Sequence, residues 1–125
     1  MASHIEGRGT TATEEAEAAH AEGKLSIAKG IAAHAEGYGT TAQGKHTHAE
    51  GENTIAVGFA AHAEGYLTAA QGNYSHAEGQ NITAKGSHSH GEGYSDNKAN
   101  SVTTSTNTDE IIAAWKNKKF SLASN

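Results

Sequence analysis

The residues of this chain that could do chemistry are histidine and glutamate, and they recur as one tetrapeptide. His-Ala-Glu-Gly begins at residues 20, 34, 48, 62 and 76, and the variant His-Gly-Glu-Gly begins at residue 90. An imidazole two residues away from a carboxylate could transfer protons or bind a metal ion. Equivalent copies at a constant step of 14 residues nevertheless argue against catalysis, because an active site needs one unique constellation.

Glycine gives the chain a second, shorter period. An Ala-x-Gly motif lies halfway between consecutive tetrapeptides, so glycine recurs every seven residues. A coiled-coil heptad is excluded, because one glycine per heptad would cost about 1 kcal/mol each relative to alanine and no bulky apolar seam is present. The period instead predicts a short strand followed by a turn in which glycine supplies a positive φ angle. The turn glycines are Gly23, Gly30, Gly37, Gly44, Gly51, Gly58, Gly65, Gly72, Gly79, Gly86 and Gly93.

Two such units make one 14-residue coil, and stacked coils predict an all-β fold. The fold would be a parallel β-roll, or solenoid, with two short strands per coil. Alternation along the strand directs Ala21 and its equivalents inward, and His20 and Glu22 outward. Methyl groups bury little apolar surface, at roughly 25 cal/mol per Å², so a single roll would be weakly stable. We therefore expect the roll to pack against copies of itself.

Stacking would align the histidines and glutamates in two parallel rows, which we call the His/Glu ladder. The interpretation that we favour is structural, with each His–Glu pair hydrogen-bonded within a chain or across a subunit interface, and it includes no metal and no cofactor. A metal site, with ligands converging at about 2.0–2.2 Å, and a pH sensor, with imidazoles that charge together, stay open. The ladder comprises His20, Glu22, His34, Glu36, His48, Glu50, His62, Glu64, His76, Glu78, His90 and Glu92.

The composition argues against several classes of protein. The net charge is −5 and no cluster of Lys and Arg could neutralise a run of phosphates, so nucleic-acid binding is not expected. No apolar run approaches the ~18 residues that cross a bilayer, so we expect no membrane insertion in this fragment. Cysteine and a Gly-x-Ser-x-Gly motif are both missing from the sequence. We therefore predict no enzyme and no catalytic residue.

The N-terminal residues depart from the period. Residues 1–10 include Ile5-Glu6-Gly7-Arg8, a protease recognition sequence common in expression vectors, and are predicted to be a remnant of recombinant expression and a linker. The β-roll is predicted to occupy residues 11–94. Its first coil should be irregular, because Ala12 lies eight residues before His20 where the repeat requires six.

The C-terminal residues 95–125 are predicted to be a non-repeat insertion or cap. One alternative is a helix at residues 109–118, whose Ile111, Ile112 and Trp115 would form an apolar stripe that covers the open end of the roll. The pattern at residues 121–125 matches the repeat, which predicts a partial coil there.

Two coils carry a resemblance to known families. The coil "NTIAVGFAAHAEG" at residues 53–65 resembles the repeat of YadA-like head domains of trimeric autotransporter adhesins, and "YSHAEG" at residues 74–79 is more similar to repeats of phage tail-fibre or spike proteins. The resemblance, which covers about residues 10–94, implies a left-handed β-roll in a homotrimer. It implies a structural and adhesive module of a surface fibre, on a virion tail or an extracellular cell surface.

The same resemblance suggests partners. The chain itself is the first, and a host-cell surface receptor or glycan is the second. A segment of a phage tail fibre or spike is the function that we favour. The alternatives are the head domain of a bacterial trimeric autotransporter adhesin and a metal-binding repeat protein that uses the histidine row.

Overall fold

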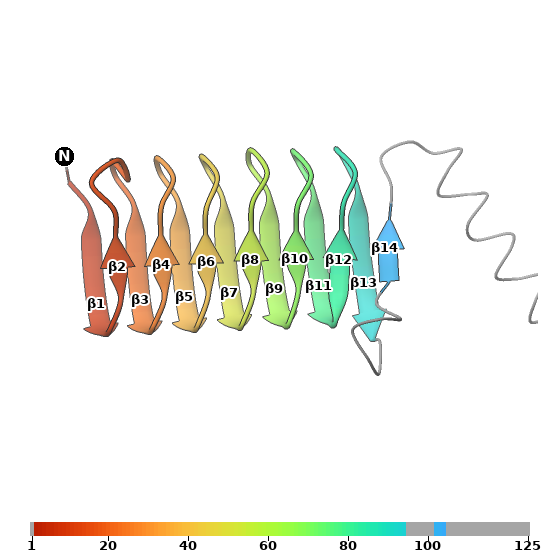
Figure 1. Cartoon of the computed structure of the whole chain (residues 1–125), viewed down its shortest axis with the longest axis horizontal. Helices are drawn as coiled ribbons and strands as arrows, with labels where there is room; N and C mark the ends of the chain where they lie inside the picture. Colours follow the sequence, from red (N-terminus) through yellow and green to blue (C-terminus); the bar gives the residue numbers. More distant parts are fainter. Residues whose placement is uncertain (1, 95–101, 105–125) are drawn as a thin grey trace, which may run out of the picture.

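The chain folds as an elongated parallel β-roll in which coils stack one behind the other (Figure 1). The computed structural model describes residues 2–94 and 102–104, the last three by their backbone alone. The predicted helix at 109–118 and the partial repeat at 121–125 lie outside the described residues. No helix long and apolar enough to cross a membrane occurs in the described part of the chain.

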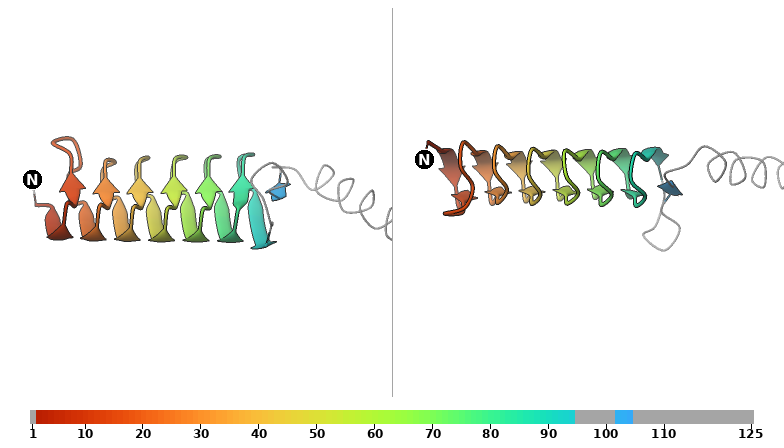
Figure 2. Two further views of the ribbon diagram at one scale, coloured as in Figure 1. Left: turned by 60° about the horizontal axis from the view of Figure 1, so that its bottom comes forward. Right: turned by 90° about the horizontal axis from the view of Figure 1, so that it is seen from above.

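Two sheets of seven strands form the two walls of the roll, as two further views show (Figure 2). Sheet A consists of five-residue strands: β1 (His4–Arg8), β3 (His20–Lys24), β5 (His34–Tyr38), β7 (His48–Glu52), β9 (His62–Tyr66), β11 (His76–Gln80) and β13 (His90–Tyr94). Sheet B consists of shorter strands: β2 (Thr11–Ala12), β4 (Ile27–Ala28), β6 (Thr41–Ala42), β8 (Ile55–Ala56), β10 (Ala69–Ala70), β12 (Ile82–Ala84) and β14 (Val102–Thr104). The predicted fold class, an all-β parallel roll with two short strands per coil, is confirmed.

Every strand pairs in parallel with the equivalent strand of the next coil. Between β5 and β7 the partners are His34 with His48, and the alanines and glutamates that follow pair in the same register. Backbone hydrogen bonds between coils continue beyond the paired strands, since the His34 amide donates to the Thr47 carbonyl at 2.9 Å. The 14-residue period of the sequence is therefore the register of both sheets.

The interior between the sheets is almost entirely methyl groups. Among the residues that the structure describes, the buried hydrophobic ones are alanines and Ile82, and Ala21 and its equivalents in β5, β7, β9 and β11 are completely buried, as predicted. A column of small polar residues shares this interior, and sequence reasoning missed it: Thr40, for example, donates a hydrogen bond to the Ser26 hydroxyl at 3.0 Å. Small side chains therefore fill most of this interior, and Ile82 in β12 is the largest of its fully buried side chains.

The predicted turn glycines fall into two sets, and the positive φ predicted for all of them is found in only one. That set lies within the sheet A strands instead of in turns, as Gly51 does in β7. Gly51 and the other glycines of the His-x-Glu-Gly motif have positive φ, 108° in this case. Gly58, from the Ala-x-Gly set, has no positive φ, but an added Cβ would lie 2.1 Å from the Gly72 oxygen of the next coil. The second set is therefore required by the close approach of neighbouring coils.

Non-glycine residues occupy the left-handed positions two residues after these glycines. They have φ between 54° and 61° despite carrying a Cβ atom, which costs roughly 1–2 kcal/mol per residue. Closure of the coil fixes the backbone here, whatever the side chain. These residues are Leu25, Ala32, His46, Asn53, Ala60, Leu67, Tyr74, Asn81 and His88.

The structure extends the roll beyond both of its predicted limits. β1 begins at His4, upstream of residue 11, and pairs in register with β3. Because His4 pairs with His20, the first coil has 16 residues instead of 14, which explains its predicted irregularity. At the other end β14 pairs with β12, so sheet B continues past residue 94. The origin of residues 1–10 in recombinant expression stays a prediction.

Candidate functional site

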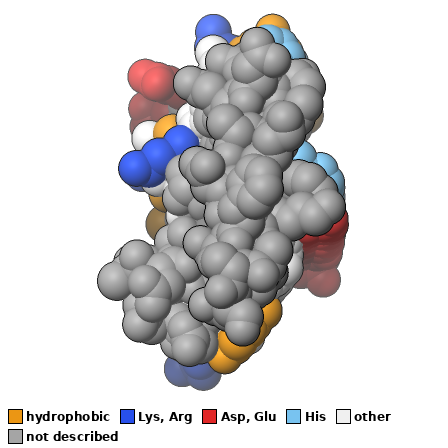
Figure 3. Space-filling view, turned by 90° about the vertical axis from the view of Figure 1, so that its right-hand side faces the viewer, with side chains coloured by type: hydrophobic (Ala, Val, Ile, Leu, Met, Phe, Trp, Pro, Cys, Tyr) orange, Lys and Arg blue, Asp and Glu red, His pale blue; other side chains and the backbone are white. Residues whose placement is uncertain are grey.

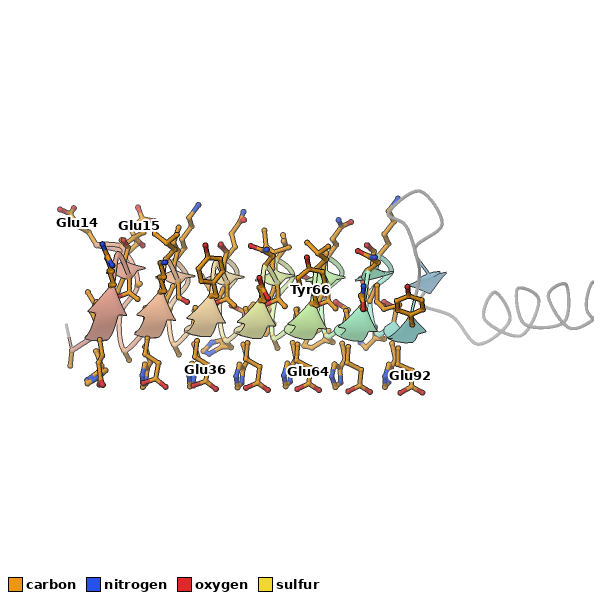
Figure 4. All side chains as sticks on the ribbon, turned by 90° about the horizontal axis from the view of Figure 1, so that it is seen from below. Glu14, Glu15, Glu36, Glu64, Tyr66 and Glu92 are labelled. Carbon is orange, nitrogen blue, oxygen red and sulfur yellow. The ribbon has the colours of Figure 1, made fainter. Side chains whose placement is uncertain are left out.

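The His/Glu ladder runs along the outer face of sheet A. Its twelve predicted residues are all brought together, because the sheet A strands from β3 to β13 turn their alanine or glycine inward and their histidine and glutamate outward. Figure 3 shows His and acidic side chains together on one side of the roll, seen end-on. Figure 4 shows the row from the side, with Glu36, Glu64 and Glu92 pointing away from the sheet in one direction.

The structure adds a seventh pair to the ladder. His4 and Glu6 pair in register with His20 and Glu22, and the His4 Nε2 lies 3.1 Å from Glu6 Oε2. Sequence reasoning missed this copy because Ile5 occupies the place of the inward alanine. The variant at His90, which has glycine in that place, was the sign that the second position of the motif tolerates substitution.

The imidazole rings of the ladder stack face to face. From His20 to His76, consecutive ring centroids lie 4.6–4.7 Å apart and the planes differ by 1–9°. His90 continues the stack at 4.9 Å, and the ring of His4 is tilted by 57°. The spacing equals the separation of paired strands, so the backbone sets the distance between the rings.

The carboxylates form a second row beside the rings, along an open groove of about 1040 Å³ that is lined by the glutamates and glycines of the motif. Such close carboxylates share protons. Hydrogen bonds with Glu64 and Glu36 raise the pKa of Glu50 to about 7, and a hydrogen bond with Glu64 raises the pKa of Glu78. The pKa of Glu64 is lowered, because it accepts hydrogen bonds from Glu50 and Glu78. The carboxyls of Glu50 and Glu78, two coils apart, therefore keep their protons to a higher pH than the carboxyl of Glu64 between them.

The rings remain uncharged at neutral pH in the middle of the row. Desolvation lowers the pKa of His48, and the neighbouring imidazoles of His62 and His34 lower it further. The pKa of His62 is lowered by the same two effects. Neutral imidazoles keep a free lone pair on one ring nitrogen, which is the form that binds metal ions.

The rings and carboxylates of the seven pairs approach each other at 3.1–3.9 Å. Within a coil the Nε2–Oε2 distance rises from 3.3 Å for His20 and Glu22 to 3.8 Å for His90 and Glu92. Towards the C-terminus each ring also meets the preceding coil, as His76 does, with its Nε2 3.4 Å from Glu64 Oε1. The predicted His–Glu pairs are therefore in contact, but most are longer than a strong charge-assisted hydrogen bond. The hydrogen bond predicted within each pair is not formed in the chain by His20, His34, His48, His62 and His76, and one across a subunit interface stays a prediction.

The sequence comparisons identify the repeat. Residues 21–47, 35–61 and 49–66 match the family model described as the YadA head domain repeat. These are YadA-like β-roll repeats. The three matches overlap with the 14-residue step that separates the coils, so the YadA-like unit coincides with the structural coil. Comparisons with curated proteins and with solved structures found no match.

The ladder gives these YadA-like repeats a chemical capacity besides their scaffold. His, Glu and the next His in the row place ligand atoms within 4.8 Å of one another in several successive coils, for instance at His62, Glu64 and His76. Donors of this kind suit metal ions and proton exchange. No member of the row is distinguished from the others as a catalytic group would be, because neighbouring coils repeat the same contacts.

Proposed function

We propose that this chain is a non-enzymatic segment of a homotrimeric surface fibre, in which the roll serves as a stiff structural and adhesive module. The match to the YadA head repeat supports an adhesin-like module of an extracellular surface structure. The proposal of a trimer rests on the alanine interior of the roll.

An alanine interior gives one chain little hydrophobic stabilisation. The buried hydrophobic residues are alanines with Ile82 as the exception, and each methyl group contributes only a fraction of the 1.5–3 kcal/mol of a buried Val, Leu or Ile. Meanwhile Leu25 and Phe59 expose 49% and 41% of their surface at the turns. Packing against further copies would bury such side chains and add the missing stabilisation.

Sheet B provides the face through which the copies pack. Its outward residues, among them Ile27, Ile55 and Ala69, are half-buried and uncharged. The outer face of sheet A carries the carboxylates of the ladder, and their desolvation at an interface would be expensive. Three rolls joined through sheet B would therefore leave the His/Glu ladder facing outward.

The shape of the roll fits a fibre. Coils advance in one direction, with β1 at one end and β14 at the other (Figure 1). A trimer of such rolls would be a rod with its long axis along the stack. We infer a phage tail fibre or spike as the source, because "YSHAEG" resembles repeats of those proteins; the head of a bacterial trimeric autotransporter adhesin is the second candidate.

Adhesion would follow from the same exposed faces. A host-cell surface receptor or glycan would contact the outward rows of sheet A or the turns. Tyr66, at the end of β9, exposes 40% of its surface, and Tyr74, at a turn, exposes 54%. The fibre would then act on a virion tail or a cell surface, at the place where a host is first met.

Sedimentation equilibrium at neutral pH, with and without a chelator, tests the trimer. We expect a trimer in both conditions, and we expect Ile55→Asp on the outer face of sheet B to dissociate it. Tyr66→Asp is the matched control, because it puts the same charge on an exposed position at the end of β9 in sheet A. A monomeric wild type, or equal dissociation by both variants, would refute the proposal.

A further inference from the structure

Five ring nitrogens of the ladder have no hydrogen-bond partner in the described structure. The Nε2 atoms of these rings are buried although the side chains as a whole are about one third exposed. A buried polar atom in a native protein normally has a partner, which can be a water molecule or an ion. The same Nε2 atom lies 3.3–3.7 Å from a carboxylate oxygen of its own coil in each case, so this arrangement is a property of the repeat. The five residues are His20, His34, His48, His62 and His76.

The carboxylate oxygens lie at the distance at which a shared cation would hold them. The His76 Nε2 is 3.4 Å from Glu64 Oε1 of the preceding coil and 3.7 Å from Glu78 Oε2 of its own coil. Zinc–nitrogen and zinc–oxygen bonds of about 2.0–2.2 Å at a tetrahedral angle separate N and O by about 3.3–3.5 Å. The two nitrogen–oxygen separations are therefore within a few tenths of an ångström of those in a zinc site, and the two carboxylate oxygens would have to lie about 3.4 Å apart when the cation is bound.

The stacking of the rings limits each cation to one imidazole. His62 and His76 are stacked with centroids 4.7 Å apart and planes only 9° from parallel, so their in-plane lone pairs do not converge. Two zinc–nitrogen bonds would span at most about 4.2 Å. Each cation would then have one nitrogen, two carboxylate oxygens and an open position towards the groove. Mixed imidazole and carboxylate donors favour a transition metal over Mg²⁺ or Ca²⁺.

We propose that the His/Glu ladder binds divalent transition-metal cations such as Zn²⁺, with the primary site formed by Glu64, His76 and Glu78. Equivalent sites lie on either side of it. His90 has Glu78 Oε1 at 3.4 Å and Glu92 Oε2 at 3.8 Å, and His62 has Glu50 Oε1 at 3.9 Å and Glu64 Oε2 at 3.7 Å.

Each shared carboxylate would bridge two sites. Glu64 presents Oε1 to His76 and Oε2 to His62, so one oxygen serves each coil. Cations in adjacent coils would lie about one strand spacing apart, roughly 4.8 Å, and would repel each other. The sites therefore fill one after another with falling affinity, and these three coils hold at most three cations.

Equilibrium dialysis of the untagged full chain against zinc chloride, with zinc measured by atomic emission, tests the proposal. We expect at least one zinc ion per chain at neutral pH. His76→Ala should lower the zinc bound at saturation by about one ion per chain, because the flanking sites keep His62 and His90. Glu64→Gln with Glu78→Gln removes a ligand from all three sites and should lower the zinc affinity at least tenfold while keeping the side-chain shapes. Circular dichroism with and without zinc shows whether each variant keeps the roll.

His46→Ala and His88→Ala are the matched controls, since both residues are exposed histidines at turns and outside the ladder. Their zinc binding should equal that of the wild type. Zinc binding that is absent from the wild type, unchanged in His76→Ala, or lost equally in the controls would overturn the proposal. The sedimentation experiment is independent of these outcomes, because a chain that is trimeric but takes up no zinc in dialysis would refute this site and leave the fibre proposal intact.

Discussion

Three glycine-to-alanine variants separate the two roles that glycine plays in the roll. Gly93 has a φ of 119°, and no atom of the described residues lies within 4 Å of an added Cβ, so we expect Gly93→Ala to introduce backbone strain alone. Gly58 has no positive φ but would place its Cβ 2.1 Å from the Gly72 oxygen, so Gly58→Ala introduces the clash alone. Gly51, with a φ of 108° and a Cβ position 2.2 Å from the Gly65 oxygen, combines both effects.

The expected losses of stability follow from these contacts. An alanine held at such a φ costs about 1–3 kcal/mol, which is the whole expectation for Gly93→Ala. To relieve the Gly58→Ala clash, neighbouring coils must separate by about 1 Å, which takes the 2.8 Å bond from the Val57 amide to the Ala70 carbonyl beyond hydrogen-bonding distance. Two to four lost bonds at about 1 kcal/mol each give roughly 2–4 kcal/mol. Gly51→Ala should lower the free energy of unfolding by the sum of the strain and the clash, about 3–7 kcal/mol.

Urea unfolding followed by far-UV circular dichroism measures these differences per chain. The midpoint should fall least for Gly93→Ala, more for Gly58→Ala and most for Gly51→Ala, which fails to fold at the upper end of its range. A Gly51→Ala variant as stable as Gly93→Ala would refute the reasoning, because the close approach of the coils would then add nothing to the strain.

Two further outcomes are expected from the turns and from the carboxylate row. Ala60→Gly should stabilise the chain by about 0.5–1 kcal/mol, because Ala60 has a φ of 55° that glycine adopts freely. The control Ala56→Gly, in β8, should destabilise the chain. Thermal unfolding measures both variants, and equal effects would contradict the left-handed turn. Glu50→Gln tests how stability depends on pH. The pKa of Glu50 is raised to about 7, so the protonated Glu50 carboxyl stabilises the fold fully below pH 4.5, and this stabilisation is lost as the pH rises through 7. With chelator present, Glu50→Gln should therefore unfold at a higher temperature than the wild type at pH 8 and at a similar temperature at pH 5, and a difference that grows towards pH 5 would contradict the shared proton.

The repeat was predictable because one step of 14 residues leaves a single way to stack the coils. Alanine at every second place of the sheet A strands decides which face is inward, and this fixes the row of His and Glu on the outside. The register and all twelve ladder residues follow from that pattern alone.

The turns were less predictable because the structure overrides residue preference there. Leu67 and Tyr74 have left-handed backbones although neither type favours them, and no shared chemistry marks their positions. β1 was missed for a related reason: its motif carries Ile5, so a search for alanine passes over it. The distances between Nε2 atoms and carboxylates depend on side-chain rotamers, which no repeat pattern specifies.

The stacked coils cover distance slowly. One coil consumes 14 residues and advances the chain by a single ring spacing of 4.6 Å, whereas the same residues in an α-helix would span about 21 Å. An α-helix would therefore span the same distance with far fewer residues. What the roll provides is polyvalent display, because every coil repeats its outward side chains at a fixed pitch. A partner with a matching repeat of its own would engage many weak contacts at once, and its avidity would grow with the number of coils.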